Sequence, residues 1–535
     1  MVNRIFTLFF VCSICSIAWS QGQPVAAAGT PVSGAAATSE SPAAGALNEA
    51  KELFRDDHYS EAAAKFRVII AGNPKSEEAQ ALLVRSLLRD HDPDAAEEAA
   101  KKAAEALPSS AAVKAAAGDA AFRLGKFEEA DADYRAAFKL DPANPRGWYG
   151  VGRIYEMVSL HHKAKLVFAK AHDLDPSDVE IFREWLSMLS PAEKPDALKK
   201  RFGDKPNTRQ QQELDRATEI AKKEPWTLAS EIKPYEIKMN QIGRKDAVND
   251  KQDAVIAVAS GYALQARFND RATADLKLDT GAGGILIGRK LAERAGFVKL
   301  SDTYIGGIGD KGGVRAEQGW IDKITIGPIE FRNCLVEVSS RNGILDDQGL
   351  IGPDIFAKFL ITLDFKEKKM LLGPLPKNPN ATGNGLDDQD RYVAPEMQSY
   401  TKIWRFGHDL MIPVLVSDKA TGNFILDTGA ETNHFSTRIA SQVTKLDKDG
   451  RYQMQGISGD VKNVVSGNKA ILQFGPIRAR SDDFPASSFD GISESEGTEI
   501  AGLIGIKTLV QTKMTIDYRD GLVKFDVYDF KPARE

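Results

Sequence analysis

The sequence predicts an all-α helical array followed by an all-β domain that is written twice. Three patterns in the 535 residues support this architecture. In the first third of the chain a proline recurs every 34 residues, at Pro74, Pro108, Pro142 and Pro176. After about residue 253, short apolar runs broken by glycine indicate β-strands. Within that region the tripeptide Asp-Thr-Gly begins at Asp279 and again at Asp427, 148 residues later.

The composition is that of an ordinary soluble protein. Apolar residues make up 42% and charged residues 27% of the chain, and the formal net charge is −5. We therefore expect no nucleic-acid partner, because proteins that bind nucleic acids carry a marked excess of basic residues. The length is sufficient for several domains.

Residues 1–20 are predicted to be a signal peptide. Arg4 supplies a positive start, Ile5–Ile17 an apolar core, and Ala18-Trp19-Ser20 a small-residue cleavage site. The alternative is an anchor that stays in the membrane, although the core is short for a bilayer span. We expect an exported protein, periplasmic or extracellular, without an integral membrane segment after signal removal. Residues 21–44 are rich in Ala, Gly, Ser and Pro and predict a disordered linker.

The mature chain has a single cysteine. Cys12 and Cys15 lie within the predicted signal, which leaves Cys334. No intramolecular disulfide can form, and the strand-like run Phe331–Val338 predicts that Cys334 is a buried apolar residue and not a nucleophile.

Residues 45–190 carry the 34-residue period. Twelve positions before each proline stands a small residue, at Ala62, Ala96, Ala130 and Ala164. The pattern resembles the tetratricopeptide repeat (TPR), which has the same period. The resemblance implies four stacked helix pairs, closed by a capping helix at Asp178–Leu189, and a protein partner on the array. A spacer or an oligomerisation module is the alternative.

Residues 191–252 form a charged bridge between the two regions. Thr208–Lys223 predicts a polar helix and Tyr235–Ile242 a first strand. An inhibitory segment whose lysines reach an acidic site is an alternative role for the bridge.

Residues 253–375 and 401–535 are two copies of one β fold, joined by a linker at 376–400. Ala263–Gly281 aligns without a gap on Met411–Gly429, and further matched segments follow in the same order. Among them, Leu350-Ile351-Gly352 parallels Leu503-Ile504-Gly505.

Here the sequence resembles the aspartic proteases, and each copy is similar to a retropepsin-type lobe. The resemblance implies a bilobal all-β fold in which Asp279 and Asp427 are catalytic. It also implies that a glycine-rich flap in each lobe covers the substrate and that no metal or other cofactor is needed. Support of the catalytic loops is expected from Thr280, Gly281, Thr428 and Gly429, and flap contacts with substrate from Gly307, Ile308, Gly309, Gly456, Ile457 and Ser458.

The expected reaction explains why the lobe is doubled. Two carboxyl groups at hydrogen-bonding distance share one proton. The ionised member takes a proton from water, which attacks the peptide carbonyl, and the protonated member hydrogen-bonds the carbonyl oxygen. The substrate is a peptide or protein, and a single chain can supply both carboxyls.

Several features depart from the family pattern and leave alternatives open. Ala282-Gly283-Gly284 gives the first loop little side-chain support, and Lys507 points either toward the aspartates or, as we expect, to solvent. A catalytically degenerate, peptide-binding scaffold is therefore the alternative function, and a homodimer the alternative arrangement. Gly307-x-Gly309-x-x-Gly312 matches a dinucleotide fingerprint, but a strand-like segment follows it where that fingerprint requires a helix.

Overall fold

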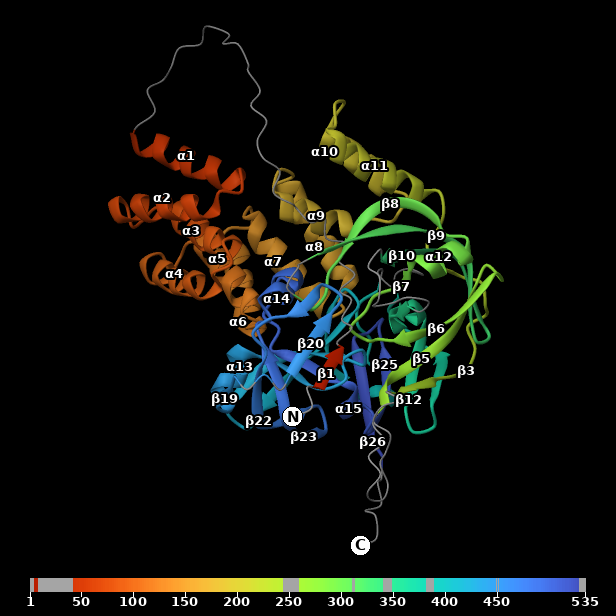
Figure 1. Ribbon diagram of the computed structural model, residues 1–535. Coiled ribbons are helices and arrows are strands. Elements are labelled where there is room, and N and C mark those ends of the chain that lie inside the picture. The colour runs from red at the N-terminus through yellow and green to blue at the C-terminus, as the bar shows by residue number, and fades with distance from the viewer. Residues whose placement is uncertain are drawn as a thin grey trace. The chain divides into compact units, whose positions relative to one another are not determined.

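The computed structural model describes residues 4–7, 42–243, 259–309, 313–339, 349–381, 389–448, 450 and 452–528. Contacts divide the chain into a helical unit, with described residues 42–154 and 164–185, and a β-rich unit that holds the other described residues (Figure 1). The predicted fold class is confirmed, since helices come first and a β-rich region follows.

The helical unit contains paired antiparallel helices that keep the predicted period. Ala62, Ala96, Ala130 and Ala164 are fully buried, so paired helices approach closely. Each repeat proline follows the end of a second helix, which it cannot continue. The helices are α1 (Pro42–Arg55), α2 (Tyr59–Gly72), α3 (Glu77–Arg89), α4 (Pro93–Ala106), α5 (Ala111–Arg123), α6 (Phe127–Leu140), α7 (Pro145–Met157), α8 (His161–Leu174) and α9 (Val179–Ser187).

Glycines make room for an aromatic side chain between repeats. The Tyr134 side chain is fully buried. A Cβ added at Gly150 would lie 2.0 Å from the Tyr134 ring, and one at Gly118 would lie 2.7 Å from it. The Tyr134 hydroxyl donates a hydrogen bond to Asp119 at 2.9 Å. The aromatic position therefore fills the space between α5, α6 and α7.

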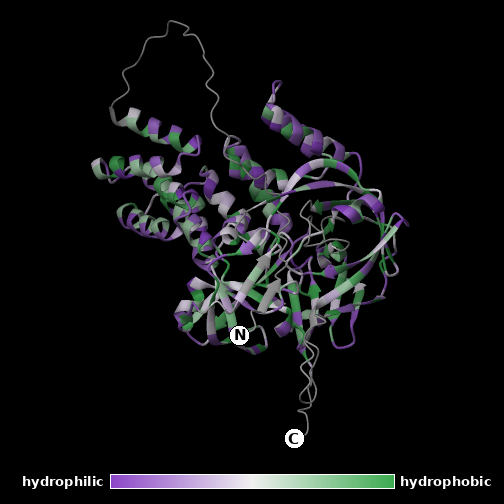
Figure 2. Ribbon diagram, viewed as in Figure 1, coloured by the Kyte–Doolittle hydropathy of each residue, from purple (hydrophilic) through white to green (hydrophobic). Residues whose placement is uncertain are grey.

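The described part of the bridge contains two helices and three short strands, the first of which is β2 (Thr227–Leu228). In α11 (Thr208–Ala221) no residue is fully buried, and Figure 2 shows the helix to be largely hydrophilic. Asn207 caps it, because its side chain accepts from the amide of Gln210 while the Gln210 side chain accepts from the Asn207 amide. The other elements are α10 (Lys194–Phe202), β3 (Tyr235–Lys238) and β4 (Asn240–Gly243). Residues 244–252 of the bridge lie outside the described residues.

Each lobe of the β-rich unit is built on one sheet, and the two sheets have the same strand order. In lobe 1 the order β10-β7-β11-β6-β5 matches β23-β18-β24-β17-β16 in lobe 2. The predicted duplication is therefore confirmed. In lobe 1 these strands are β5 (Ala259–Phe268), β6 (Ala272–Leu278), β7 (Ile285–Gly288), β10 (Ile329–Ser339) and β11 (Gly349–Ile351). In lobe 2 they are β16 (Asp409–Val416), β17 (Ala420–Asp427), β18 (His434–Ser436), β23 (Ile477–Ser487) and β24 (Gly502–Gly505).

A six-stranded sheet joins the lobes through matched strands. β12 (Phe359–Asp364) of lobe 1 pairs antiparallel with β25 (Thr512–Asp517) of lobe 2. Thr362 lies opposite Thr515, its counterpart in the duplication, and their hydroxyls are hydrogen-bonded at 2.9 Å. The pseudo-twofold axis between the lobes therefore passes through this pair. The sheet is completed by β3, β13 (Lys369–Pro374), β14 (Thr401–Lys402) and β26 (Leu522–Val527).

The apolar core of the β-rich unit runs through both lobes. Cys334 is fully buried in β10, as predicted, and it belongs to this core. Of the predicted signal peptide only Arg4–Thr7 is described. It forms β1, which runs parallel to β20 (Tyr452–Gly456) of lobe 2. Residues 1–3 and 8–20, the linker up to residue 41, and residues 382–388 of the second linker lie outside the described residues.

Candidate active site

Asp279 and Asp427 stand at equivalent places in the two lobes. β6 and β17 each carry the chain to an Asp-Thr-Gly turn. β11 pairs with β6 in parallel, and β24 pairs with β17 in the same way. The segments 350–352 and 503–505 therefore cross beside the two turns.

The two turns are joined by reciprocal hydrogen bonds between threonines. The Thr280 amide donates to the Thr428 hydroxyl at 3.0 Å, and the Thr428 amide donates to the Thr280 hydroxyl at 3.0 Å. Each hydroxyl donates in turn to a carbonyl of the other lobe, Thr280 to Leu426 at 2.6 Å and Thr428 to Leu278 at 3.0 Å. One chain thus brings both loops together.

The two carboxyl groups are fully buried but differently supported. The Oδ1 atom of Asp279 accepts one backbone hydrogen bond, from Gly281 at 2.9 Å. The Oδ1 atom of Asp427 accepts two, from Gly429 at 2.7 Å and from Ala430 at 2.9 Å. Since N–H donors stabilise the ionised form, Asp427 is the better carboxylate of the pair.

Burial raises the pKa values of both groups, and the charge of Asp427 adds to the rise at Asp279. Burial, and then the charge of Asp427, raise the pKa of Asp279 well above its usual range. Burial raises the pKa of Asp427 to about 6, although its backbone hydrogen bonds oppose the rise. Such a pair holds one shared proton over a range of pH, with Asp427 ionising first. The arrangement can activate water and polarise a carbonyl at the same time.

Sequence reasoning missed Lys277, two residues before Asp279. Its half-buried side chain reaches the other lobe, where Nζ donates to the carbonyl of Gly429 at 2.7 Å. The signal was present in the sequence, because Lys277 stands where the second copy has Ile425, two residues before the Asp-Thr-Gly turn.

The flap residues of the two lobes meet. The Ser458 amide donates to the Ile308 carbonyl at 3.1 Å. A Cβ added at Gly309 would lie 2.3 Å from the Ser458 backbone, and one at Gly456 would lie 2.0 Å from the Ile308 carbonyl oxygen. Gly307 precedes this contact in the chain. Residues 310–312 of the first flap lie outside the described residues.

Ile457, at the tip of the second flap, packs into lobe 1. It is buried in an apolar cluster with five residues of the other lobe. These are Ala282, Leu286, Ile305, Ala316 and Leu350. The predicted flap residues Ile308, Ile457 and Ser458 are all buried.

The departures from the family pattern have structural compensations. The Gly284 amide donates to the Asp354 carboxylate at 3.0 Å, which supports the first loop despite its glycines. In lobe 2 the Gly505 amide donates at 3.0 Å to Oδ1 of Asn433. Lys507 is partly exposed and pairs with Glu431 at 3.2 Å, so its charge is engaged by a loop carboxylate.

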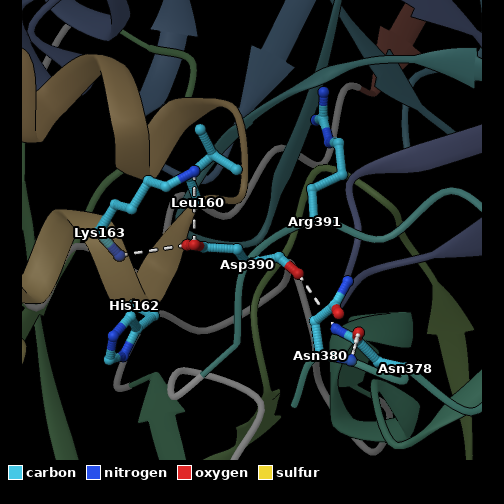
Figure 3. A pocket seen from close by; sticks show the side chains of 7 residues that line it. All are labelled: Leu160, His162, Lys163, Asn378, Asn380, Asp390 and Arg391. Carbon is cyan, nitrogen blue, oxygen red and sulfur yellow. Dashed lines mark hydrogen bonds and ion pairs between the residues drawn. The ribbon is translucent and has the colours of Figure 1, made fainter. Parts of the chain in front are cut away.

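Other candidate sites carry less chemistry. A polar cavity of about 230 Å³ is lined by Leu160, His162, Lys163, Asn378, Asn380, Asp390 and Arg391. Figure 3 shows Lys163 and Asp390 joined there, by an Nζ to Oδ2 contact of 3.7 Å. Arg391 is used structurally, since its Nε donates to the Asp520 carbonyl at 2.6 Å.

Two lysines of the bridge pair with nearby glutamates. Lys233 pairs with Glu231 at 3.1 Å, and Lys222 pairs with Glu219. Within the described ranges, no group of three His, Cys, Asp or Glu side chains could hold a metal ion. No helix among these residues is both long and apolar enough to cross a bilayer.

Comparisons with known proteins agree with both regions. Residues 264–355 match a family model described as aspartyl protease. Residues 47–111 match one described as tetratricopeptide repeat, and residues 118–158 one described as TPR repeat. No curated protein matches the chain.

Solved structures similar to this chain are distant from it. An aspartic proteinase from Irpex lacteus is 10% identical over 56% of this chain and 99% of its own, with a TM-score of 0.33. A TPR protein of Thermus thermophilus is 18% identical over 33% of this chain and 98% of its own, with a TM-score of 0.29. PilF of Pseudomonas aeruginosa is 19% identical over 34% of this chain and 84% of its own, with a TM-score of 0.26.

The assignment rests on the 34-residue period, the paired Asp-Thr-Gly loops and the family matches. The chain joins tetratricopeptide repeats to a domain of the aspartyl protease kind.

Proposed function

We propose that this protein is an exported aspartic endopeptidase that hydrolyses peptide bonds through Asp279 and Asp427. The observation that carries the proposal is the pair of hydrogen bonds between Thr280 and Thr428. They join the two loops that carry the buried carboxyl groups at equivalent positions of one chain. These contacts within one chain favour a catalytic monomer over a homodimer.

The roles follow from the hydrogen bonds around each carboxyl. Asp427, with two amide donors, is the base that takes a proton from the attacking water. Asp279 keeps its proton and donates a hydrogen bond to the substrate carbonyl, which stabilises the developing oxyanion. As the tetrahedral intermediate collapses, the proton that Asp427 accepted passes to the leaving amine.

The test is cleavage of a peptide library by the mature protein from pH 3 to 8. Asp279→Asn and Asp427→Asn should each abolish cleavage, and a statine-type mimic of the tetrahedral intermediate should block it. Asp270→Asn, at an exposed position, is the matched control and should cleave normally. Absence of cleavage by folded protein, or cleavage that survives both active-site substitutions, would favour the peptide-binding scaffold.

Two further measurements test the oligomeric state of the active protein and its export. If the activity per mole of protein falls on dilution, the active species is a homodimer and not a monomer. Fractionation of cells that express the full chain, beside a variant without residues 1–20, tests export. Retention of the full chain in the cytoplasm would contradict it.

We propose that the repeat array binds a protein and so selects which substrates reach the protease. The support is the stacked repeat architecture, which in such arrays presents an extended binding surface. Deleting residues 45–190 should change which proteins are captured from a lysate. An unchanged set of captured proteins and cleaved substrates would leave a spacer role.

A further inference from the structure

Lys277 breaks the symmetry between the two lobes next to the catalytic pair. Its counterpart in the duplication is Ile425, since the two stand at the same place in β6 and β17. The registers match as well: Lys277 lies opposite Ala263, and Ile425 lies opposite Met411. One lobe therefore carries a cation where the other carries an apolar side chain.

The structure makes room for this cation. A Cβ added at Gly261 would lie 2.9 Å from Cε of Lys277, so the glycine leaves space for the aliphatic stem. The ammonium then crosses to lobe 2 and donates to the Gly429 carbonyl at 2.7 Å. Lys277 thus adds a further link between the lobes beside the threonine hydrogen bonds.

The Gly429 carbonyl belongs to the peptide unit that supports Asp427. The other end of that unit is the Ala430 amide, which donates to Asp427 Oδ1 at 2.9 Å. Hydrogen bonds in a chain polarise one another, so a cation on the carbonyl strengthens the donor at the other end. In lobe 1 the corresponding amide, that of Ala282, donates to the backbone carbonyl of Asp279 at 3.2 Å.

We propose that Lys277 is a positioning residue which, through the Gly429–Ala430 peptide unit, keeps Asp427 as the carboxylate of the pair and leaves the shared proton on Asp279. The inference rests on the proposed peptidase function and adds to it the feature that decides which aspartate is the base.

Several charged groups bear on Lys277. Burial lowers the pKa of its ammonium, whereas the charges of Asp279, Asp427 and Glu431 oppose that change. Glu431 is itself paired with Lys507. Burial, and then the charges of Glu496, Asp427 and Asp279, raise the pKa of Asp409 on β16, which therefore lies near both catalytic aspartates. Asp354 also contributes to that rise. Lys277 itself donates a hydrogen bond to the second catalytic loop.

The first experiment compares Lys277→Met with the unaltered protein across pH. Loss of the cation should move the acid limb of kcat/KM to higher pH by about one unit, which is about a tenfold loss below that limb. Lys277→Arg keeps the charge and should return the limb part of the way. Lys507→Met removes a nearby charge that is paired with Glu431, and it should leave the limb in place. A Lys277→Met protein that is less active at every pH, with an unmoved limb, would overturn the proposal.

The second experiment does not depend on catalysis. The mature protein is labelled with 13C at aspartate carboxyls, and the two active-site signals are assigned with Asp279→Asn and Asp427→Asn. Asp427 should ionise first, and Lys277→Met should raise its titration midpoint more than that of Asp279. Equal midpoint shifts, or none, would overturn the inference. If the midpoints shift as expected in a protein that cleaves nothing, the peptidase proposal fails and the role of Lys277 in ionisation remains.

Discussion

The Cα of Gly429 faces the carboxyl group of Asp279 across the two lobes. A Cβ added at Gly429 would lie 2.2 Å from Asp279 Oδ2 and 2.3 Å from its Cγ. The second catalytic loop therefore requires glycine because the first catalytic side chain occupies the space of a Cβ. The close approach of Gly429 to the Asp279 carboxyl shows that the two catalytic loops pack directly against each other.

Gly429→Ala should displace the Asp279 carboxyl and lower kcat/KM by about 100-fold, the usual effect of moving a catalytic group by about 1 Å. Overpacking should also cost about 1–3 kcal/mol of unfolding free energy. Peptide cleavage and chemical denaturation measure the two effects. Gly373→Ala is the control, because a Cβ there meets nothing within 4 Å. Full activity of Gly429→Ala would show that the carboxyl position is not fixed.

The pH profile of cleavage should be bell-shaped, with its acid limb near pH 6. The proposed active form has Asp427 ionised and Asp279 protonated. Activity should rise as pH passes about 6, where Asp427 loses its proton. It should fall at higher pH as Asp279 loses its proton, since the pKa of that group is well above its usual range. Initial rates from pH 3 to 10 with one peptide give the profile. An optimum below pH 4 would contradict the proposed order of ionisation.

Asp427→Asn should make the protein more stable at neutral pH while removing its activity. A carboxyl with a raised pKa destabilises the fold as pH rises from its unfolded value near 3.9 to its folded value of about 6. Asparagine avoids this ionisation, and its Oδ1 still accepts the two amide bonds. We expect a gain of about 2 kcal/mol at pH 7 and none at pH 3.

Thermal unfolding of both proteins at the two pH values measures this difference. Asp270→Asn is again the control, since its hydrogen bond with Lys323 gives Asp270 a lowered pKa and not a raised one. An Asp427→Asn protein that is destabilised equally at pH 3 and pH 7 would mean that ionisation of Asp427 does not oppose folding.

The sequence predicted the architecture well because both regions repeat themselves. The spacing of the prolines and of Ala62, Ala96, Ala130 and Ala164 is set by helix packing, which acts locally. The order of elements around Asp279 likewise repeats around Asp427. Duplicated local signals of this kind can be read without knowing any contact between the copies.

Contacts across the pseudo-twofold axis could not be predicted in this way. The pairing of Thr362 with Thr515 depends on how two distant strands meet. The bond from Lys277 to Gly429 depends on a side chain that crosses between lobes. Lys507 was a candidate in the sequence because it closely follows the matched segment Leu503–Gly505, yet it pairs with Glu431. Lys277 lies in a strand that alternates apolar and polar residues, where comparison with Ile425 was the available clue.

Ile457 should hold the second flap closed on lobe 1. Its burial beside Leu286 and Ile305 contributes about 2 kcal/mol to the closed position. Ile457→Ala should therefore raise KM and speed hydrogen exchange of the Ser458 amide, which donates to Ile308, by about tenfold or more. Val461→Ala, in β21 (Gly459–Val461) of the same hairpin, is the matched control. Unchanged exchange in the flap of Ile457→Ala would mean that this contact does not close it.

Arg146 should hold the repeat array together, and its contribution should depend on pH. The guanidinium is largely buried and contacts Asp119 at 3.0 Å, Asp178 at 3.3 Å and Glu180 at 2.8 Å. Removing it leaves buried carboxylates without their main cation, so Arg146→Met should lose about 3 kcal/mol at pH 7. Arg135→Met is the control: it removes a partly exposed pair with Asp131, and we expect a loss below about 0.5 kcal/mol.

The effect of Arg146→Met should shrink in acid. Burial opposes ionisation of Asp178, but the charges of Arg146 and Arg85 outweigh it and lower the pKa of Asp178. A lowered pKa stabilises the fold above the unfolded value near 3.9, and this contribution is lost as pH falls through the folded value. Thermal unfolding at pH 7 and pH 3 should therefore show a large difference from the unaltered protein at pH 7 and a small one at pH 3. An equal difference at both values would mean that Arg146 stabilises the array by packing its stem and not by its charge.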